Sequence, residues 1–316
     1  MAGRAFVGAR SVERRSGHNL RRGIVMGSHG KSIGVAILSA CLILLPGLDG
    51  QLAARDFPHR VEVVKIENLN HNIKRIRLKM NDGDRFSFAP GQHIFLRPPD
   101  DFIAEWNGRY QTTHKEVYRP YSFASSPSRR PFFDLIIKHY VAPRGKDVPP
   151  GVVSTYVHTR LKVGNVVTLS EPAGKLYADS DSDRPIVLVA GGVGASPFVG
   201  LLDYWFENSV DQKREVYFFL GVNARRDLIL HEQLTKWNDE KENFHYIAAL
   251  SRPEKDDRWD GPTGYINLVL DKHFKGTLDV DAYLAGPPIM VRETIKVLTA
   301  KGVDRDQIHR DPIRVR

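Results

Sequence analysis

The alternation of hydrophobic and polar positions divides the chain into three parts. Residues 32–48 (SIGVAILSACLILLPGL) form an apolar run without a charge. From residue 57 to about residue 180, short segments alternate between apolar and polar positions, and from residue 183 fully apolar segments alternate with amphipathic ones. These periods predict an N-terminal hydrophobic helix, a β-rich domain and an α/β domain.

The β-rich part, residues 57–180, has the pattern of a small antiparallel barrel. Residues 61–66 (VEVVKI) and 74–80 (KRIRLKM) alternate like half-buried strands. Turn residues separate further strand candidates at 93–96, 119–124, 132–140 and after Lys162–Asn165. Many short strands between turn signals are typical of a barrel. We expect one helix from Gly151 through VVSTYVHTRL, and a long loop near a functional opening over residues 101–118.

The α/β part, residues 183–316, predicts a doubly wound parallel sheet. Its expected strands are PIVLVAG, VYFFLG, FHYIAAL and DAYLAG, and its expected helices are ASPFVGLLDYWF, RDLILHEQLTKW and MVRETIKVLTAK. Strands that alternate with helices in this way pair in parallel, and ligands bind such sheets at the carboxyl ends of the strands.

The apolar run 32–48 is about the shortest stretch that spans a bilayer as a helix, which takes roughly 17–25 residues. One interpretation is an uncleaved transmembrane anchor. A second is the hydrophobic region of a signal peptide, with the small residues Ala53 and Ala54 near the cleavage point. A third is a core helix, against which the absence of a polar face argues.

The start of translation decides the orientation that we expect. From Met1, the basic leader of residues 1–31 holds the N-terminus inside and directs the rest outside. From Met26, the positive charges lie mainly after the apolar run, which puts the folded domains in the cytoplasm. Residues 1–25 also resemble a transit peptide, and Arg21-Arg22 resembles a twin-arginine signal. We favour a membrane anchor with cytoplasmic catalytic domains.

The net charge of +9 is concentrated in the leader, where seven Lys and Arg residues stand against Glu13 alone. The remaining chain is close to balanced, which argues against nucleic acid as a partner. Cys41 is the single cysteine, so no internal disulfide can form. Structural zinc and iron–sulfur sites usually need several thiolates. We therefore expect no metal site, and electron chemistry that uses an organic cofactor or a partner protein.

A glycine-rich turn, GGVGASP, follows the apolar strand PIVLVAG and opens a helix. Glycines at such a turn let the backbone approach a pyrophosphate, and the helix N-terminus offers free N–H groups. The alternative is a tight turn that binds nothing. The candidate nucleotide-binding residues are Gly191, Gly192, Val193, Gly194, Ser196 and Pro197.

A second turn of small residues, Ala285-Gly286-Pro287-Pro288, also follows an apolar strand and precedes a helix. Two such turns at one edge of a parallel sheet form a cleft for a ligand. The alternative is a loop that is shaped only by its prolines.

The segment RPYS, Arg119–Ser122, carries groups that suit a flat anionic ligand. The guanidinium of Arg119 suits paired phosphate oxygens, and the ring of Tyr121, on the same strand face, can stack on a heterocycle. Ser122 can donate a hydrogen bond. As an isolated string, RPYS is a core strand more often than a ligand site. The helix that begins at Gly151 offers a second anion site.

The motifs RPYS, GVVST, GGVGASP and AGPP, in that order, resemble the ferredoxin–NADP reductase superfamily over roughly residues 57–311. The resemblance implies an FAD-binding barrel followed by an NAD(P)-binding domain. It implies that Arg119 binds the flavin pyrophosphate, that Tyr121 stacks on the flavin and that Ser122 lies near its reactive nitrogen. Tyr121, Ser122 and Ala285 are the implied catalytic residues. The cofactor-binding residues implied in the barrel are Arg119, Pro120, Tyr121, Ser122, Lys138, Tyr140, Gly151, Val152, Val153, Ser154 and Thr155, of which Lys138 and Tyr140 face the ribose and adenine.

Within this superfamily, KDVPPGVVSTYVH and ALSRPEKDDRWDGPTGYI are similar to the reductase module of the F subunits of sodium-pumping NADH:quinone oxidoreductases. Those proteins carry a ferredoxin domain between anchor and barrel, where this chain has only a short stretch after Leu48, so we expect no iron–sulfur cluster. The superfamily usually has cysteine at the position of Ala285, so we expect slower hydride transfer. The ending HRDPIRVR lacks the frequent terminal aromatic residue, so we expect a more open flavin face.

The sequence therefore predicts an FAD-dependent NAD(P)H oxidoreductase that passes electrons to a protein or quinone acceptor near a membrane. Arg225 and Arg226 follow the strand VYFFLG and either hold the 2′-phosphate of NADPH or form an exposed helix start. The resemblance favours NADH over NADPH. The alternatives are the reductase component of an oxygenase system and a non-catalytic nucleotide-binding subunit of a membrane complex.

Overall fold

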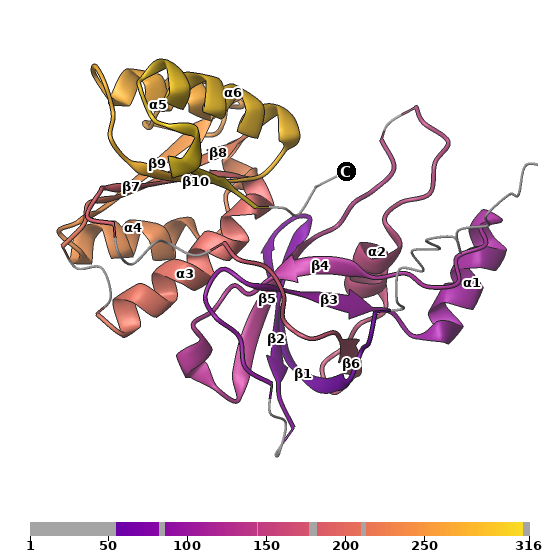
Figure 1. Cartoon of the computed structure of the whole chain (residues 1–316). Helices are drawn as coiled ribbons and strands as arrows, with labels where there is room; N and C mark the ends of the chain where they lie inside the picture. Colours follow the sequence, from indigo (N-terminus) through magenta and orange to yellow (C-terminus); the bar gives the residue numbers. More distant parts are fainter. Residues whose placement is uncertain (1–54, 82–85, 144, 177–181, 210–212, 312–316) are drawn as a thin grey trace, which may run out of the picture. The chain divides into compact units, whose positions relative to one another are not determined.

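A computed structural model describes residues 55–81, 86–143, 145–176, 182–209 and 213–311 (Figure 1). The basic leader and the apolar run 32–48 lie outside these residues, and so does the hydrophobic helix expected there. Over the ranges that are described, no helix combines the length and the apolar character that a membrane span requires.

The first described part is an antiparallel barrel, as predicted. Its strands follow the order β4-β3-β6-β1-β2-β5. A bridge between Phe123 and Leu135, with Ala124 N donating to Asp134 O at 2.8 Å, joins the end of β4 to β5 and closes the barrel. The strands are β1 His59–Asn70, β2 Ile73–Lys79, β3 His93–Arg97, β4 Arg119–Ser122, β5 Phe132–Lys138 and β6 Val166–Leu169.

Alternation explains these strands, because β1 buries every second side chain at its start, including Val61 and Val63. The helix expected at Gly151 is α2, Val152–Thr159. A short 3₁₀ turn, η1, covers Pro127–Arg129.

The expectation of a loop over residues 101–118 is wrong for its first part, which is helix α1, Asp100–Tyr110. Phe102, Ile103 and Trp106 are buried against the barrel, at the spacing of one helical face. Asp100 and Asp101 lie in the first turn, where acidic side chains favour a helix. The helix is short, so its apolar residues make too little periodicity to stand out in the sequence.

The second part is a parallel sheet with helices on both faces, again as predicted. Its strand order is β11-β10-β7-β8-β9. The strands are β7 Ile186–Gly191, β8 Val216–Val222, β9 Phe244–Leu250, β10 Asp281–Ala285 and β11 Ile308–Arg310. The helices are α3 Ser196–Glu207, α4 His231–Glu240, α5 Ile266–His273 and α6 Pro288–Ala300, with short turns η2 Gly192–Ala195, η3 Arg225–Asp227 and η4 Arg305–Gln307.

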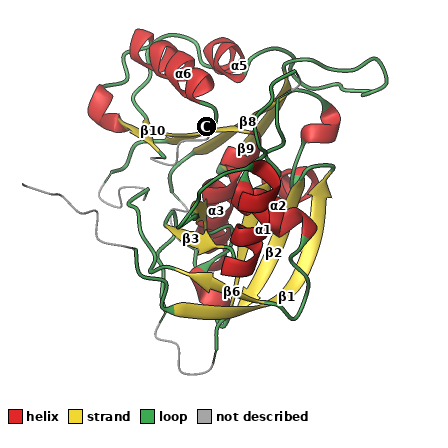
Figure 2. Ribbon diagram, turned by 90° about the vertical axis from the view of Figure 1, so that its right-hand side faces the viewer, coloured by secondary structure: helices red, strands yellow, loops and turns green. Residues whose placement is uncertain are grey.

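The order of the strands reverses between β7 and β10. The chain runs from β7 through β8 to β9 on one side and then returns to place β10 on the other side of β7. Figures 1 and 2 show α5 and α6 on one face of the sheet and α3 on the other. The chain therefore leaves β7 and β10 in opposite directions along the sheet. Open α/β sheets bind ligands at such a switch point.

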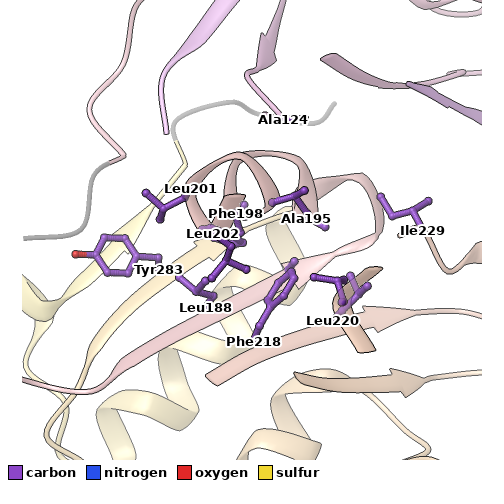
Figure 3. Packing of buried hydrophobic residues seen from close by; sticks show 14 of the residues in the cluster. Ala124, Leu188, Ala195, Phe198, Leu201, Leu202, Phe218, Leu220, Ile229 and Tyr283 are labelled. Carbon is purple, nitrogen blue, oxygen red and sulfur yellow. The ribbon is translucent and has the colours of Figure 1, made fainter. Parts of the chain in front are cut away.

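One hydrophobic core lies under α3 and extends into the barrel. Phe198 and Leu202 of α3 pack on Leu188 of β7, as Figure 3 shows. The same cluster of buried residues contains Ala124 and Ile136 of the barrel. Shared apolar burial therefore joins the two halves of the described chain.

Direct polar contacts hold α3 against the end of β4. Asp203 is buried and accepts hydrogen bonds from Ser126 N at 2.9 Å and from Arg129 Nη2 at 2.6 Å. A Cβ atom at Gly200 would lie 2.4 Å from Phe123 O, so only glycine allows this close approach. These contacts fix the barrel relative to the parallel sheet at the place where both contribute to the site described next.

Candidate functional site

A cavity of about 690 Å³ lies where the barrel meets the carboxyl edge of the parallel sheet. It brings together residues of all four sequence motifs, which come from β4, the start of α2, the turn after β7 and the turn after β10. The predicted residues that line it are Arg119, Pro120, Tyr121, Ser122, Lys138, Tyr140, Gly151, Val152, Val153, Ser154, Val193, Gly194, Ser196, Pro197, Ala285 and Gly286.

Arg119 presents an exposed guanidinium to this cavity. Its Nη1 donates to the carbonyl oxygen of the adjacent Tyr118 at 2.8 Å. Among the residues that the structure describes, none of the ion pairs involves Arg119. A guanidinium that no carboxylate neutralises is suited to an anionic ligand such as a phosphate.

Two tyrosines form flat, neutral walls of the cavity. Burial raises the pKa of the Tyr121 hydroxyl above its usual value, and the nearby Tyr140 raises it further, while the charge of Arg119 lowers it. Burial also raises the pKa of Tyr140 to about 12. Both phenols therefore stay protonated at neutral pH and can stack on an aromatic ligand without adding charge.

The start of α2 offers backbone N–H groups to the same cavity. No side chain caps this helix at Gly151, and its first turn holds no acidic residue. Ser154 Oγ instead accepts from Tyr140 N at 3.1 Å and donates to Gly151 O at 3.0 Å, which ties the helix start to the segment that follows β5. A helix N-terminus of this kind attracts a phosphate.

The turn after β7 and the turn after β10 contact each other directly. This contact gives their glycines a role in packing. A Cβ at Gly194 would lie 2.3 Å from Ala285 O, and one at Gly286 would lie 2.8 Å from Gly191 N. These glycines therefore serve close packing of turn against turn. Gly192 has nothing within 4 Å of a Cβ, but its φ of 53° is in the left-handed region that favours glycine.

Several predicted residues lie outside the cavity lining. Thr155 Oγ1 is 3.3 Å from His139 Nε2. Arg225 and Arg226 follow β8 and bind the loop after β9, where Arg226 Nη1 lies 2.9 Å from Glu254 Oε1. The other predicted residues outside the lining are Gly191, Gly192, Pro287 and Pro288.

Other lining residues were not predicted from the sequence. Phe95 and Tyr118 contribute to the lining, and so do Val141, Pro143, Pro149 and Pro150. Asp311 follows β11, and its N–H donates to Leu284 O at 2.9 Å, next to Ala285. The prolines of the segment 141–150 were the one signal of a structured wall, and nothing in the sequence placed Asp311 there.

An antiparallel barrel and a doubly wound parallel sheet that share one cavity are typical of two-domain oxidoreductases that bind a flavin and a nicotinamide nucleotide. Residues 60–177 match the family described as the oxidoreductase FAD-binding domain. Residues 188–296 match the family described as the oxidoreductase NAD-binding domain. The chain therefore contains an oxidoreductase FAD-binding domain followed by an oxidoreductase NAD-binding domain, in the fold of the ferredoxin–NADP reductases.

Relatives and solved structures agree with this assignment. The chain is 31% identical over 274 residues to the F subunit of the Na⁺-translocating NADH-quinone reductase of Serratia proteamaculans, covering 79% of this chain and 66% of the relative. The chain thus spans slightly less than two thirds of that relative. The FAD/NAD-binding domain of the nitric oxide dioxygenase of Vibrio cholerae has a TM-score of 0.67 and 24% identity, covering 81% of this chain and 98% of that one. The ferredoxin reductase of a carbazole 1,9a-dioxygenase has a TM-score of 0.62 and 27% identity, covering 80% and 68%.

Proposed function

We propose that this chain accepts a hydride from NADH through a bound FAD and passes the electrons to a quinone or protein acceptor. One observation carries the proposal, namely that the motifs for flavin and nicotinamide line a single cavity. Hydride transfer requires the two rings to be in contact, and a shared cavity meets this requirement. We assign the FAD-binding domain to residues 57–180 and the NAD(P)-binding domain to residues 183–316.

The barrel residues fit a flavin dinucleotide. Arg119 and the uncapped start of α2 supply the positive charge and the N–H groups that a pyrophosphate requires. Tyr121 would supply a neutral ring for stacking, and Lys138 and Tyr140, which also line the cavity, would hold the ribose and adenine. When bound, FAD supplies the conversion of a two-electron hydride into electrons for the acceptor.

The turns of the parallel sheet fit the nicotinamide half of the donor. Ala285 is 2% exposed and ends β10, and Ser196 begins α3, so both lie at the edge of the sheet that faces the barrel. Ser196 Oγ is 3.5 Å from Ser122 O, which joins the two halves beside the expected position of the rings. Ser122 and Ala285 would therefore orient the reacting rings and exclude water from them.

The first experiment tests flavin and hydride donor together. Purified protein is expected to be yellow and to lose its flavin absorbance when NADH is added without oxygen. Arg119→Ala is expected to retain FAD poorly, because it removes a guanidinium that lines the cavity. Arg109→Ala removes an exposed arginine of α1 outside the cavity and serves as the matched control. Colourless wild-type protein that takes up no FAD would contradict the proposal and favour a non-catalytic nucleotide-binding subunit.

The acceptor is tested by mixing the reduced protein with candidates. Similarity to the F subunit of an NADH-quinone reductase supports a quinone or a partner subunit. Similarity to a ferredoxin reductase of a dioxygenase supports the alternative of an oxygenase reductase component. Faster oxidation by a quinone than by a ferredoxin supports the first assignment, and the reverse order supports the second.

Membrane association through residues 32–48 is part of the proposal, with the catalytic domains in the cytoplasm. The apolar character of this run supports it. The full chain is expected in the membrane fraction after a carbonate wash, and a chain without residues 32–48 is expected in the supernatant. Recovery of the full chain in the supernatant would refute the anchor.

A further inference from the structure

The turn after β8 and the loop after β9 lie side by side at the carboxyl edge of the parallel sheet. Ser251 N donates to Val222 O at 2.9 Å, and Arg252 N donates to Asn223 O at 2.7 Å. β8 is the neighbour of β7, whose turn lines the cavity. In dinucleotide-binding sheets an acidic residue near this position binds the ribose 2′-hydroxyl of NAD, and an arginine there accommodates the 2′-phosphate of NADP.

The two arginines of this turn are already bound by the loop after β9. Arg226 Nη1 lies 2.9 Å from Glu254 Oε1 and 3.1 Å from Glu254 Oε2. Arg225 Nη1 donates to Asp257 O at 2.8 Å, and Arg225 N donates to Asp257 Oδ2 at 3.1 Å. The same carboxylate oxygen accepts from Glu254 N at 2.8 Å, so this loop holds both arginines as one unit.

The balance of charge decides which nucleotide fits. Of the two guanidinium groups, that of Arg226 faces the carboxylate of Glu254, which neutralises it, while that of Arg225 donates to the carbonyl oxygens of Asp257 and Arg258. The Arg226–Glu254 pair is exposed, with 65% and 47% of the side chains accessible, so it is weak and a phosphate can displace it. The displaced Glu254 would remain beside the phosphate, however, and like charges at this range repel each other. A ribose hydroxyl meets no such repulsion and can donate to the carboxylate.

We propose that Glu254, whose loop is held in place by Asp257, makes this site selective for NADH by occupying Arg226, which a 2′-phosphate would otherwise bind. The inference rests on the proposed use of a nicotinamide nucleotide. It gives Arg225 and Arg226 a structural role in holding the loop after β9, and it makes Glu254 the residue that determines donor specificity.

The test replaces Glu254 with glutamine in the FAD-loaded protein. Glu254→Gln keeps the size and the loop contacts but removes the charge opposite Arg226. Calorimetry compares adenosine 5′-monophosphate with adenosine 2′,5′-bisphosphate, which differ only in the 2′-phosphate. We expect the variant to bind the bisphosphate about tenfold tighter than wild type does, because one charge-assisted hydrogen bond becomes available. The ratio of kcat/KM for NADPH to that for NADH should rise by a similar factor.

Matched variants separate this role from a general effect of charge. Glu240→Gln in α4 removes an equally exposed glutamate that pairs with Lys236, and it should leave both ratios unchanged. Adding Arg226→Ala to Glu254→Gln should abolish the gain.

An unchanged ratio in Glu254→Gln, or an equal rise in Glu240→Gln, would overturn the inference. Failure of both NADH and NADPH to reduce the flavin would instead refute the proposed function, while the calorimetry would still test Glu254.

Discussion

The contact of Asp203 with the barrel gives the most discriminating test of how the two halves are joined. Asp203 on α3 accepts hydrogen bonds from Ser126 N and from the Arg129 guanidinium. Burial raises the pKa of Asp203 above its usual value, although the hydrogen bond from Ser126 and the charge of Arg129 lower it. For an acid with a raised pKa, the stabilising contribution is complete below 3.8 and is lost as pH rises through the folded-state pKa. At neutral pH the negative charge of Asp203 therefore does not itself stabilise the fold.

Asp203 therefore stabilises the fold by accepting hydrogen bonds. Two substitutions distinguish this effect from the effect of its charge. Asp203→Asn keeps an acceptor for Ser126 N, and the half-exposed Arg129 can turn to solvent, so stability should change by less than about 1 kcal/mol. Asp203→Ala leaves Ser126 N, which is fully buried, without a partner. An unsatisfied buried donor costs about 1–3 kcal/mol. A loss of about 2 kcal/mol lowers Tm by roughly 4–8 °C in a domain of this size.

Thermal unfolding of the FAD-loaded protein and the rate of its reduction by NADH are the two measurements. Asp203→Ala should slow reduction about tenfold or more at saturating NADH, because α3 begins at Ser196 in the cavity and small displacements of reacting groups slow transfer strongly. Asp203→Asn should reduce the flavin at nearly the wild-type rate. Equal damage by both substitutions would show that the charge matters, and would refute this reasoning.

Three further predictions concern two residues of the cavity lining and a pair of histidines between α2 and the end of β5. Gly194→Ala should keep its FAD but lose most NADH-dependent reduction, because the new Cβ would lie 2.3 Å from Ala285 O and must push the two turns apart; an unimpaired variant would contradict this. Ala285→Cys should speed flavin reduction about two- to tenfold, since a polarisable sulfur beside an aromatic ring contributes about 0.3–1.5 kcal/mol, and stopped-flow absorbance measures the change. The stacked rings of His139 and His158 pack between α2 and β5, and burial lowers the pKa of both, with the charge of Lys74 lowering it further. Their contribution to stability is complete above pH 6.5 and is lost as pH falls through the folded-state pKa values. The urea concentration at the midpoint of unfolding should therefore decrease as the pH is lowered from 6.5. The decrease should be smaller in His139→Gln, which has one histidine fewer to protonate.

Much of the fold follows from periodicity, because alternation and apolar runs record which side chains are buried. The barrel strands and β7 to β10 were predicted in this way. Helix α5, Ile266–His273, and strand β11, Ile308–Arg310, were not predicted, since eight and three residues hold too few periods to define a pattern. For β11, parallel pairing with β10 determines the structure, which is a contact distant in sequence.

The four motifs could be located from the sequence, because each lies on, at the start of or directly after a predicted strand or helix. RPYS, GVVS, GVGASP and the start of AGPP all reach one cavity. Asp311 and the segment 141–150 reach it only through tertiary packing, which no local pattern records. The arginines after β8 show another feature that the sequence could not predict. Both partners of the Arg226–Glu254 pair can be read from the sequence, but their proximity in space cannot.

The turn after β7 packs closely against the turn after β10, so backbone contacts largely determine the shape of the cavity between them. Gly194 packs on Ala285, and Gly191 packs on Gly286 and Pro287, at distances that exclude any side chain. A site that is formed by such contacts binds its ligand with little cost of ordering. The rate of the proposed hydride transfer would depend on the distance between the two rings, and residues outside the cavity lining can influence this distance by packing on residues that line it. Gly191 and Asp203 belong to this group, so Gly191→Ala and Asp203→Ala should reduce the rate of flavin reduction more than they reduce the retention of FAD.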